Sequence, residues 1–341
     1  MNAAPQHTQS LPLVLLTGFL GSGKTTILNR LLSDPSMHET AVIVNEFGEI
    51  GVDHLLVSKV ADDVVLLASG CVCCTAGDDL GTAIASMLNR RRSGSLPPFQ
   101  RIVLETTGIA DTALLLRRIL SDAELAVQSR IQAVITVVDA VFGEATLSRY
   151  TESASQVAMA NRLVVSKLDL IDSGGVDPLV SRLRSINPTA PILLSGCDAP
   201  SANSLFGDTH SDGGFSFDAA WPSTRRQELS GATPQHADRY RTFWLAWNEP
   251  TPWNDLKAWL EGLLIARGDS ILRLKGILQV AGCAHPMIIQ GVQHALYPPK
   301  RLACWPQGSP RSELVFVTRD FSRDAAVRSI QQFLPYRIAV G

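Results

Sequence analysis

The sequence predicts an α/β protein in which a three-layer domain with a mainly parallel sheet precedes a smaller α+β domain. Two observations support the first domain: a glycine-rich strand-loop-helix motif at residues 18–26, and apolar strand-like runs that alternate with helical spacing as far as residue 194. Such continuous apolar strands are typical of parallel sheets covered on both faces. The third observation is a change of pattern after residue 235, where strands are flanked by only two helices.

Residues 18–26 read Gly-Phe-Leu-Gly-Ser-Gly-Lys-Thr-Thr and fit the phosphate-binding loop pattern. An apolar run at 13–16 precedes the loop and helical spacing at 26–32 follows it, as a P-loop NTPase domain requires. Lys24 is expected on the β- and γ-phosphates of a nucleotide, and the Thr25 hydroxyl on Mg²⁺. The residues expected to bind the nucleotide here are Gly18, Gly21, Ser22, Gly23, Lys24, Thr25 and Thr26. The alternative is a glycine-rich turn that happens to carry a lysine.

The remaining elements of the first domain follow in order. Apolar runs predict strands at 40–45, 64–67, 101–104, 133–138, 163–165 and 191–194, and helical spacing predicts helices at 78–89, 111–120, 153–160 and 177–186. Parallel strands bring their carboxyl ends to one edge of the sheet, where ligands bind. The polar motifs of this part of the chain all follow such strand ends.

The second domain begins after a segment, from about 195 to 235, that is rich in Ser, Gly, Asp and Pro and lacks periodicity. Beyond it we expect strands at 239–247, 270–280, 286–292 and 313–318 and helices at 254–266 and 323–333, arranged as an antiparallel sheet with helices on one face. The predicted organisation is a flexible tail at 1–10, the P-loop domain at 11–198, a linker at 199–236 and the α+β domain at 237–341.

Composition and charge restrict the possible partners. The chain has 341 residues, of which 45% are hydrophobic and 18% charged, as in globular proteins. A formal net charge of −2 argues against a nucleic-acid binder that works through bulk positive potential. No apolar run is long enough to span a bilayer and the N-terminus lacks a signal-peptide pattern, so we expect no membrane partner and a cytoplasmic location.

Glu105 ends the strand at 101–104 and begins the run Glu-Thr-Thr-Gly. It is placed like the second acidic element of P-loop NTPases, which contacts Mg²⁺ directly or through water. With Lys24 and Thr25 it completes the expected catalytic set. The alternative is a solvated acid or a helix cap.

Residues 166–169 read Ser-Lys-Leu-Asp, follow a predicted strand and are similar to the Asn-Lys-x-Asp element with which GTPases read guanine. Asp169 could accept two hydrogen bonds from the guanine N1–H and amino group, which adenine does not offer. Lys167 and Asp169 are therefore candidate base-binding residues. Ser166 replaces the usual Asn, and an ordinary loop with a Lys and an Asp is the alternative.

Cys71, Cys73 and Cys74 crowd into four positions after the strand at 64–67. Thiolates suit Zn²⁺ and can also hold Co, Fe, Ni or Cu(I), so the cluster predicts a metal site. Glu49 is our candidate for a further ligand, and the same upstream segment also offers Glu46, Asp53 and His54. A redox dithiol or three buried structural cysteines are the alternatives.

These motifs together resemble the CobW family of metal-handling GTPases. The resemblance rests on Gly-Phe-Leu-Gly-Ser-Gly-Lys-Thr-Thr at 18–26, Asn-Glu-Phe-Gly-Glu-Ile-Gly-Val-Asp-His at 45–54, Gly-Cys-Val-Cys-Cys at 70–74 and Glu-Thr-Thr-Gly at 105–108. It continues in Leu-Lys-Gly-Ile at 274–277 and Ile-Gln-Gly-Val-Gln-His at 289–294, and so covers nearly the whole chain. The departures are Ser166, Thr106 where Ser is commoner, and a linker without a histidine-rich run.

The resemblance implies a GTP-hydrolysing metal chaperone. Its cofactors would be GTP and Mg²⁺, with Thr25 as a Mg²⁺ ligand, and its cargo Zn²⁺ or Co²⁺ held by the three cysteines and Glu49. Binding of nucleotide would tighten metal binding, and hydrolysis would release the metal to a client metalloprotein. The chaperone would act as a monomer or homodimer. Two other functions stay open from the residues alone: an ATP-dependent phosphotransferase with structural cysteines, and a non-catalytic nucleotide-gated metal sensor.

Overall fold

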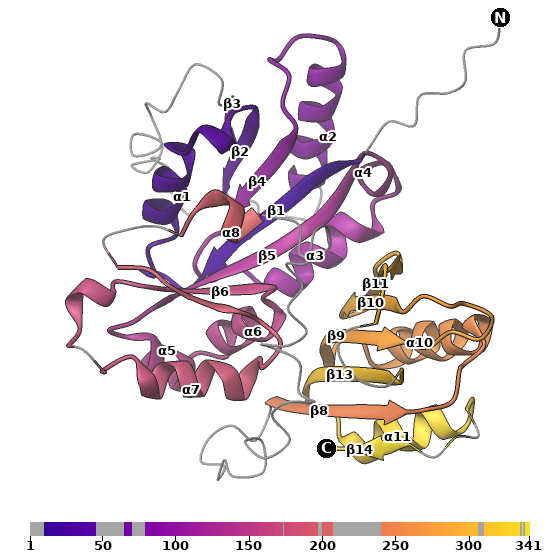
Figure 1. Cartoon of the computed structure of the whole chain (residues 1–341). Helices are drawn as coiled ribbons and strands as arrows, with labels where there is room; N and C mark the ends of the chain where they lie inside the picture. The colour runs from indigo at the N-terminus through magenta and orange to yellow at the C-terminus, as the bar shows by residue number, and fades with distance from the viewer. Residues whose placement is uncertain are drawn as a thin grey trace, which may run out of the picture. The chain divides into compact units, whose positions relative to one another are not determined.

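The computed structural model describes residues 10–45, 65–69, 79–172, 174–196, 200–206, 240–305, 310–334, 336 and 338–341. The chain divides into two compact units (Figure 1). The first comprises Met1–Thr146, Ala160–Val176 and Ile192–Thr209, and the second Leu147–Met159, Asp177–Pro191 and His210–Gly341. No helix of the described part is long and apolar enough to cross a membrane.

The first unit is built on a seven-stranded sheet with the order β3-β2-β4-β1-β5-β6-β7. Its strands are β1 (Leu11–Gly18), β2 (Thr40–Asn45), β3 (Val65–Ser69), β4 (Arg101–Glu105), β5 (Ser129–Asp139), β6 (Arg162–Ser166) and β7 (Ile192–Leu194). All neighbouring pairs are parallel, as predicted. Because β1 lies between β4 and β5, the loops that follow these three strands meet at one edge.

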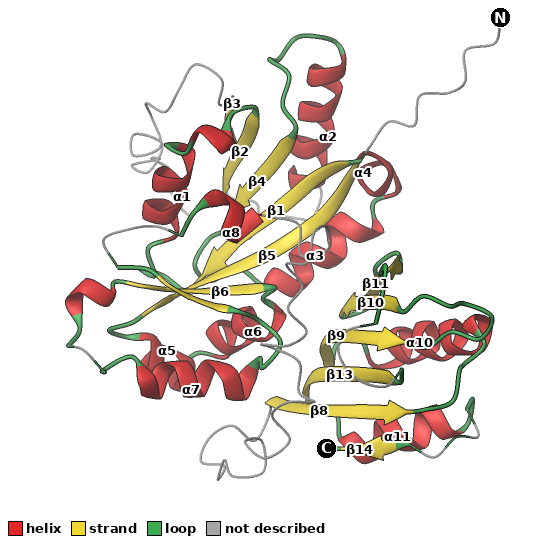
Figure 2. Ribbon diagram, in the orientation of Figure 1, coloured by secondary structure: helices red, strands yellow, loops and turns green. Residues whose placement is uncertain are grey.

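Both faces of the central strands are buried, which explains their unbroken apolar runs. Along β1, Val14 and Leu16 face a cluster formed with α1 (Lys24–Leu32), the short helix η1 (Pro35–Met37) and α8 (Ala202–Phe206). The opposite face is covered by α2 (Asp79–Arg92), α3 (Thr112–Ser121) and α4 (Ala123–Gln128) (Figure 2). Leu13 and Leu15, which point to that face, are fully buried. This is the expected three-layer P-loop NTPase architecture.

Helix α8 is a short helix in the segment 199–236, which we expected to be a linker. Its residues Ala202, Leu205 and Phe206 are nevertheless buried in the core of the first unit. The helix has only five residues, which is too short to give a periodic signal in a Ser-rich sequence. The first residues of the expected linker are therefore part of the fold.

Three further helices lie between β5 and β7 in the sequence. They are α5 (Gly143–Arg149), α6 (Thr151–Met159) and α7 (Asp177–Ile186), together with the short helix η3 (Leu168–Leu170). Helices α6 and α7 coincide with predicted helices to within two residues. Helix α5, like α4, was not predicted, because six or seven residues make fewer than two full helical turns.

The second unit contains an antiparallel sheet with the order β11-β10-β9-β13-β8-β14, to which β12 adds beside β10. Its strands are β8 (Tyr240–Trp247), β9 (Ile271–Leu278), β10 (Met287–Val292), β11 (Ala295–Leu296), β12 (Lys300–Arg301), β13 (Ser312–Arg319) and β14 (Ala339–Val340). Helices α10 (Trp253–Arg267) and α11 (Arg323–Gln331) belong to this unit, as do α6 and α7. Leu260 of α10 and Ile330 of α11 share one core with Leu274 and Phe316 of the sheet, so both helices cover the same face, as predicted.

Candidate nucleotide site

The phosphate-binding loop joins the carboxyl end of β1 to the start of α1, as the sequence predicts. Gly18, Gly21 and Gly23 all have positive φ angles, of 143°, 73° and 91°, which side-chain-bearing residues rarely adopt. Gly18 is restricted further, because a Cβ atom there would lie 2.3 Å from the carbonyl oxygen of Val137 on β5. The glycines are therefore required by the path of the backbone.

The loop leaves the first turn of α1 open to a ligand. The Ser22 amide donates to the carbonyl of Phe19 at 3.1 Å, and the Ile27 amide donates to the carbonyl of Gly23 at 3.0 Å, which starts the helix. No side chain caps the helix at Gly23. Backbone N–H groups at an uncapped helix start, with the positive end of the helix dipole, favour an anion such as phosphate.

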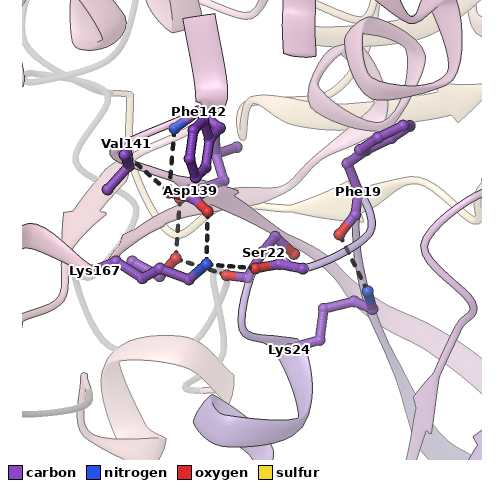
Figure 3. A network of polar contacts seen from close by, with 10 residues as sticks. Phe19, Ser22, Lys24, Asp139, Val141, Phe142 and Lys167 are labelled. Carbon is purple, nitrogen blue, oxygen red and sulfur yellow. Dashed lines mark hydrogen bonds and ion pairs between the residues drawn. The ribbon is translucent and has the colours of Figure 1, made fainter. Parts of the chain in front are cut away.

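Lys24 is the first residue of α1 and folds back over the loop. Its ammonium group donates to the carbonyl oxygens of Gly18 at 3.0 Å and Phe19 at 3.3 Å (Figure 3). The side chain is largely buried. A mainly buried ammonium group held against the loop is in position to meet the phosphates that the loop binds.

Thr25 and Glu105 lie together although 80 positions separate them. The Thr25 hydroxyl donates to Oε1 of Glu105 at 2.6 Å. Glu105 is the last residue of β4, which is the neighbour of β1 in the sheet, and the residue is 4% exposed. A hydroxyl and a carboxylate are the hard oxygen donors that Mg²⁺ prefers, so the chemistry of this pair fits a magnesium ion.

The Ser-Lys-Leu-Asp element also reaches the phosphate loop. The Ser166 hydroxyl, at the end of β6, donates to the carbonyl oxygen of Ser22 at 2.6 Å. Lys167 has a positive φ of 59°, and its ammonium group donates to the carbonyl oxygen of Gly21 at 2.7 Å. Serine in place of the usual asparagine thus still anchors the element to the loop.

Asp139 is a site residue that our sequence analysis missed. It ends β5, and its Oδ2 atom accepts a hydrogen bond from the Lys167 ammonium group at 2.6 Å (Figure 3). Its Oδ1 atom accepts from the backbone amides of Val141 at 2.7 Å and Phe142 at 3.3 Å. The available signal was its place as an acid directly after the apolar strand at 133–138.

The run Glu-Thr-Thr-Gly supports the loop from the β4 side. Thr106 is buried and its hydroxyl donates to the hydroxyl oxygen of Thr17 at 2.9 Å. Gly108 lies so close to the loop that a Cβ atom would come within 2.5 Å of the Leu20 amide nitrogen. This close approach gives the glycine of the motif a packing role that the sequence alone did not indicate.

Two other residues that we expected to bind the nucleotide, Thr26 and Asp169, have exposed side chains. Thr26 is exposed on α1, and Asp169 is exposed in the first turn of η3, two residues beyond Lys167. Ser22, by contrast, is 2% exposed and supplies the carbonyl that Ser166 contacts. The structure thus gathers the phosphate loop, Lys24, Thr25, Glu105, Ser166 and Lys167 at one edge of the sheet and leaves the Asp169 side chain accessible there.

The predicted metal ligands Cys71, Cys73, Cys74 and Glu49 lie outside the described residues, as do Glu46, Asp53 and His54. Strands β2 and β3 are described and are paired in parallel, with Asn45 opposite Ser69. Both strands therefore end at the edge that carries the phosphate loop. In the part of the chain that the structure describes, no cluster of three or more His, Cys, Asp or Glu residues could hold a metal ion.

Comparison with known proteins covers both parts of the chain. Residues 12–194 match the family described as CobW/HypB/UreG, nucleotide-binding domain. Residues 240–334 match the family described as Cobalamin synthesis protein cobW C-terminal domain. The two matches occur in the same order as the parallel and antiparallel sheets.

Individual relatives agree with this assignment. The zinc chaperone YjiA of Escherichia coli is 31% identical over 307 residues, which are 90% of this chain and 93% of that protein. The zinc chaperone CobW of Sinorhizobium is 25% identical over 325 residues, or 86% of this chain and 88% of that protein. The crystal structure of Zn(II)-bound YjiA GTPase shares the fold, with a TM-score of 0.69 and 23% identity over 96% of this chain and 99% of that chain. The chain therefore belongs to the CobW family.

Proposed function

We propose that this protein is a GTP-hydrolysing metal chaperone that binds a transition metal through its Cys-x-Cys-Cys motif and delivers it to a client metalloprotein. One observation carries the proposal: the nucleotide elements converge at the edge of the sheet from which the metal-binding segments depart. Glu49 follows the end of β2 by four positions, and Cys71 follows the end of β3 by two. Nucleotide and metal would thus be bound by loops of the same edge.

The phosphate end of the site is formed by α1 and its loop. Gly18, Gly21, Ser22 and Gly23 present the backbone, and the ammonium group of Lys24 exchanges the carbonyls of Gly18 and Phe19 for phosphate oxygens. A cation placed there stabilises the charge that develops as the terminal phosphate leaves. Thr26, exposed on the same turn, contributes to the phosphate end of the pocket.

Thr25 and Glu105 would hold Mg²⁺, which when bound neutralises phosphate charge. In their present geometry the Thr25 hydroxyl donates to Glu105, so the oxygen atoms of both side chains already lie within 2.6 Å of each other. The position of Glu105 is fixed because the residue ends the buried strand β4. This preorganisation limits the conformational entropy lost when the ion binds.

Guanine selectivity is assigned to the element at 166–169. The contacts of Ser166 with Ser22 and of Lys167 with Gly21 fix this element against the loop that binds the phosphates. Asp169 then accepts hydrogen bonds from the N1–H and amino group of guanine. Adenine has no N1–H and carries its amino group at another ring position, so it would not offer Asp169 these two donors.

The cargo is proposed to be Zn²⁺, with Co²⁺ as the second choice, bound by Cys71, Cys73, Cys74 and Glu49. Three thiolates and one carboxylate satisfy the four-coordinate geometry that Zn²⁺ adopts in proteins. Two of the family relatives are named zinc chaperones, which supports zinc over cobalt. Binding of GTP closes this site and hydrolysis opens it, so that the ion passes to the client.

The proposal is tested by titrating Zn²⁺ into the protein with GDP, with a non-hydrolysable GTP analogue, and with the corresponding ATP analogue, each with Mg²⁺. Zinc affinity is expected to increase only with the GTP analogue, because binding of GTP is proposed to close the metal site. Zinc should in turn raise affinity for the analogue, since coupling between two ligands is reciprocal. Equal zinc affinity in all three states would contradict the chaperone model. An effect of the ATP analogue equal to that of the GTP analogue would instead indicate an adenine-nucleotide enzyme.

A second measurement separates a chaperone from a non-catalytic sensor. GTP turnover is measured with and without Zn²⁺ and compared with that of Lys24→Ala, which lacks the phosphate-binding ammonium group. For a chaperone we expect slow GTP turnover, because low intrinsic rates are usual for isolated switch GTPases. Lys24→Ala is expected to lose this turnover. Turnover indistinguishable from that of the variant would favour the sensor.

A further inference from the structure

The second unit has an open groove of about 830 Å³ between α10, α11 and the start of β8. This volume falls within the range of pockets that bury a drug-sized ligand. Its lining comes from α10, from the β13–α11 connection, from α11 and from Arg241 of β8. No residue of the nucleotide site contributes to it.

The groove is open because the residues of the two helices that face it include several small ones. Gly262 and Ala266 lie one turn apart on α10, and Ala325 and Ser329 lie one turn apart on α11. A Cβ atom added at Gly262 would meet nothing within 4 Å. Large side chains at these positions would fill the space, so the sequence leaves it open.

Buried apolar side chains lie beneath the groove. Trp259 is 1% exposed, its indole N–H donates to the Ser329 hydroxyl at 3.0 Å, and its ring packs edge-on against Phe316 of the core. Leu263 and Phe321 are also buried beneath the groove. At the rim, Phe333 is 47% exposed, which offers an apolar contact to an occupant.

The charged residues of the rim are mainly arginines. Arg241, Arg267 and Arg328 come from β8, the end of α10 and α11, and all three are exposed. The described residues supply no ion-pair partner for any of the three. Among the described residues of the lining, Asp320 is the one carboxylate. The groove is therefore positive, although the whole chain carries a formal charge of −2.

We propose that this groove docks an acidic segment of a partner protein. The guanidinium groups of Arg241, Arg267 and Arg328 pair with carboxylates of the segment, since their planar donor pairs match carboxylate geometry. An apolar side chain of the segment packs above Trp259 and Phe321. Three arginines on three separate elements suit an extended chain with several charges better than one small anion.

The chemistry of the floor and of the chain disfavours other occupants. A small inorganic anion would make no use of the apolar floor. A nucleic acid requires a broad field of positive charge, which a net charge of −2 does not provide. The proposal rests on the second unit alone, so it is independent of the nucleotide and metal chemistry proposed above.

The test uses the full chain and a fluorescein-labelled peptide of glutamates with one central leucine, whose binding is followed by fluorescence polarisation. Arg267→Gln and Arg328→Gln are each expected to weaken binding by roughly two- to tenfold, as for partly exposed charge-assisted pairs. The matched control is Arg301→Gln, which removes an exposed arginine of β12 outside the groove. It should leave binding unchanged.

Gly262→Leu tests the cavity without changing charge. Leucine would occupy the open space above Gly262 and is expected to weaken peptide binding at least as much as the loss of one arginine, with no loss of helix stability. Thermal melts of all variants verify folding. Equal effects of the groove variants and of Arg301→Gln would overturn the proposal. So would displacement of the peptide by inorganic phosphate, or equal binding of a single-stranded oligonucleotide or of a peptide with lysine in place of glutamate.

Discussion

At the scale of single residues, the Lys167 ammonium group joins three parts of the nucleotide site. The ammonium group donates to Asp139 at the end of β5 and to the Gly21 carbonyl of the phosphate loop. Lys167 itself directly follows the last residue of β6. The positive φ of Lys167 costs on the order of 1 kcal/mol for a residue with a side chain. The two contacts offset this cost and hold the backbone two residues before Asp169, the residue proposed to bind guanine.

Asp139→Asn tests the charged part of this arrangement. Asparagine keeps an oxygen acceptor for the amides of Val141 and Phe142 but removes the negative charge opposite Lys167. We expect affinity for a fluorescent GDP analogue to fall roughly three- to tenfold, the range of a partly exposed charged hydrogen bond. The thermal midpoint should change little. Asp172→Asn, which alters an exposed acid downstream of the same element, serves as control. Unchanged affinity of Asp139→Asn would mean that Asp139 only caps its own turn.

At the scale of elements, α10 retains a glycine that its own geometry does not require. Gly262 lies in the helix interior, its φ is not positive, and a Cβ atom there would meet open space. Glycine in such a position loses more backbone entropy on folding than alanine does. The open groove above it is therefore maintained at the expense of helix stability.

Gly262→Ala should raise the free energy of unfolding by about 0.5–1 kcal/mol. The measurement is urea denaturation followed by circular dichroism. Gly268→Ala is the matched control at the end of the same helix, because its Cβ atom would lie 2.5 Å from both the His294 ring and the Leu264 carbonyl oxygen. We expect that second variant to be destabilised. Lower stability of Gly262→Ala would show that the position is more crowded than the structure indicates.

At the scale of the whole molecule, the proposed nucleotide site and the proposed docking groove belong to different units. The parallel sheet of the first unit carries the nucleotide site, and the antiparallel unit carries the arginine groove. A metal chaperone needs a nucleotide, a metal and a client, and the first two are proposed to share one edge of the first sheet. The groove is proposed as a docking surface for an acidic partner segment, and a client is one protein that could carry such a segment.

Cys73→Ala/Cys74→Ala separates metal binding from nucleotide binding. We expect the double variant to lose tight Zn²⁺ binding, measured by competition with a chromophoric chelator, because two of the proposed four ligands are removed. Binding of a fluorescent GDP analogue should persist. The control is Cys283→Ala/Cys304→Ala, which removes two free thiols of the second unit. Simultaneous loss of zinc and nucleotide binding in the first variant would show that the cysteine segment is structural.

The sequence by itself determined the elements whose signals are local. The phosphate loop is recognisable because strand, loop and helix are contiguous, and the strands of the first sheet because burial on both faces requires unbroken apolar runs. The Ser-Lys-Leu-Asp and Glu-Thr-Thr-Gly motifs could be placed because each follows such a strand. The metal ligands Cys71, Cys73, Cys74 and Glu49 remain a prediction, as do the domain boundaries.

Only the tertiary structure decided the features that depend on distant residues. Asp139 pairs with Lys167 across 28 positions, and Gly108 meets Leu20 because β1 and β4 are neighbours in the sheet. The role of Ser166 in place of asparagine became clear from its contact with Ser22, and the groove of the second unit depends on how α10 and α11 pack. Such contacts leave no periodic signal, because the order of strands in a sheet is not the order of strands in the chain.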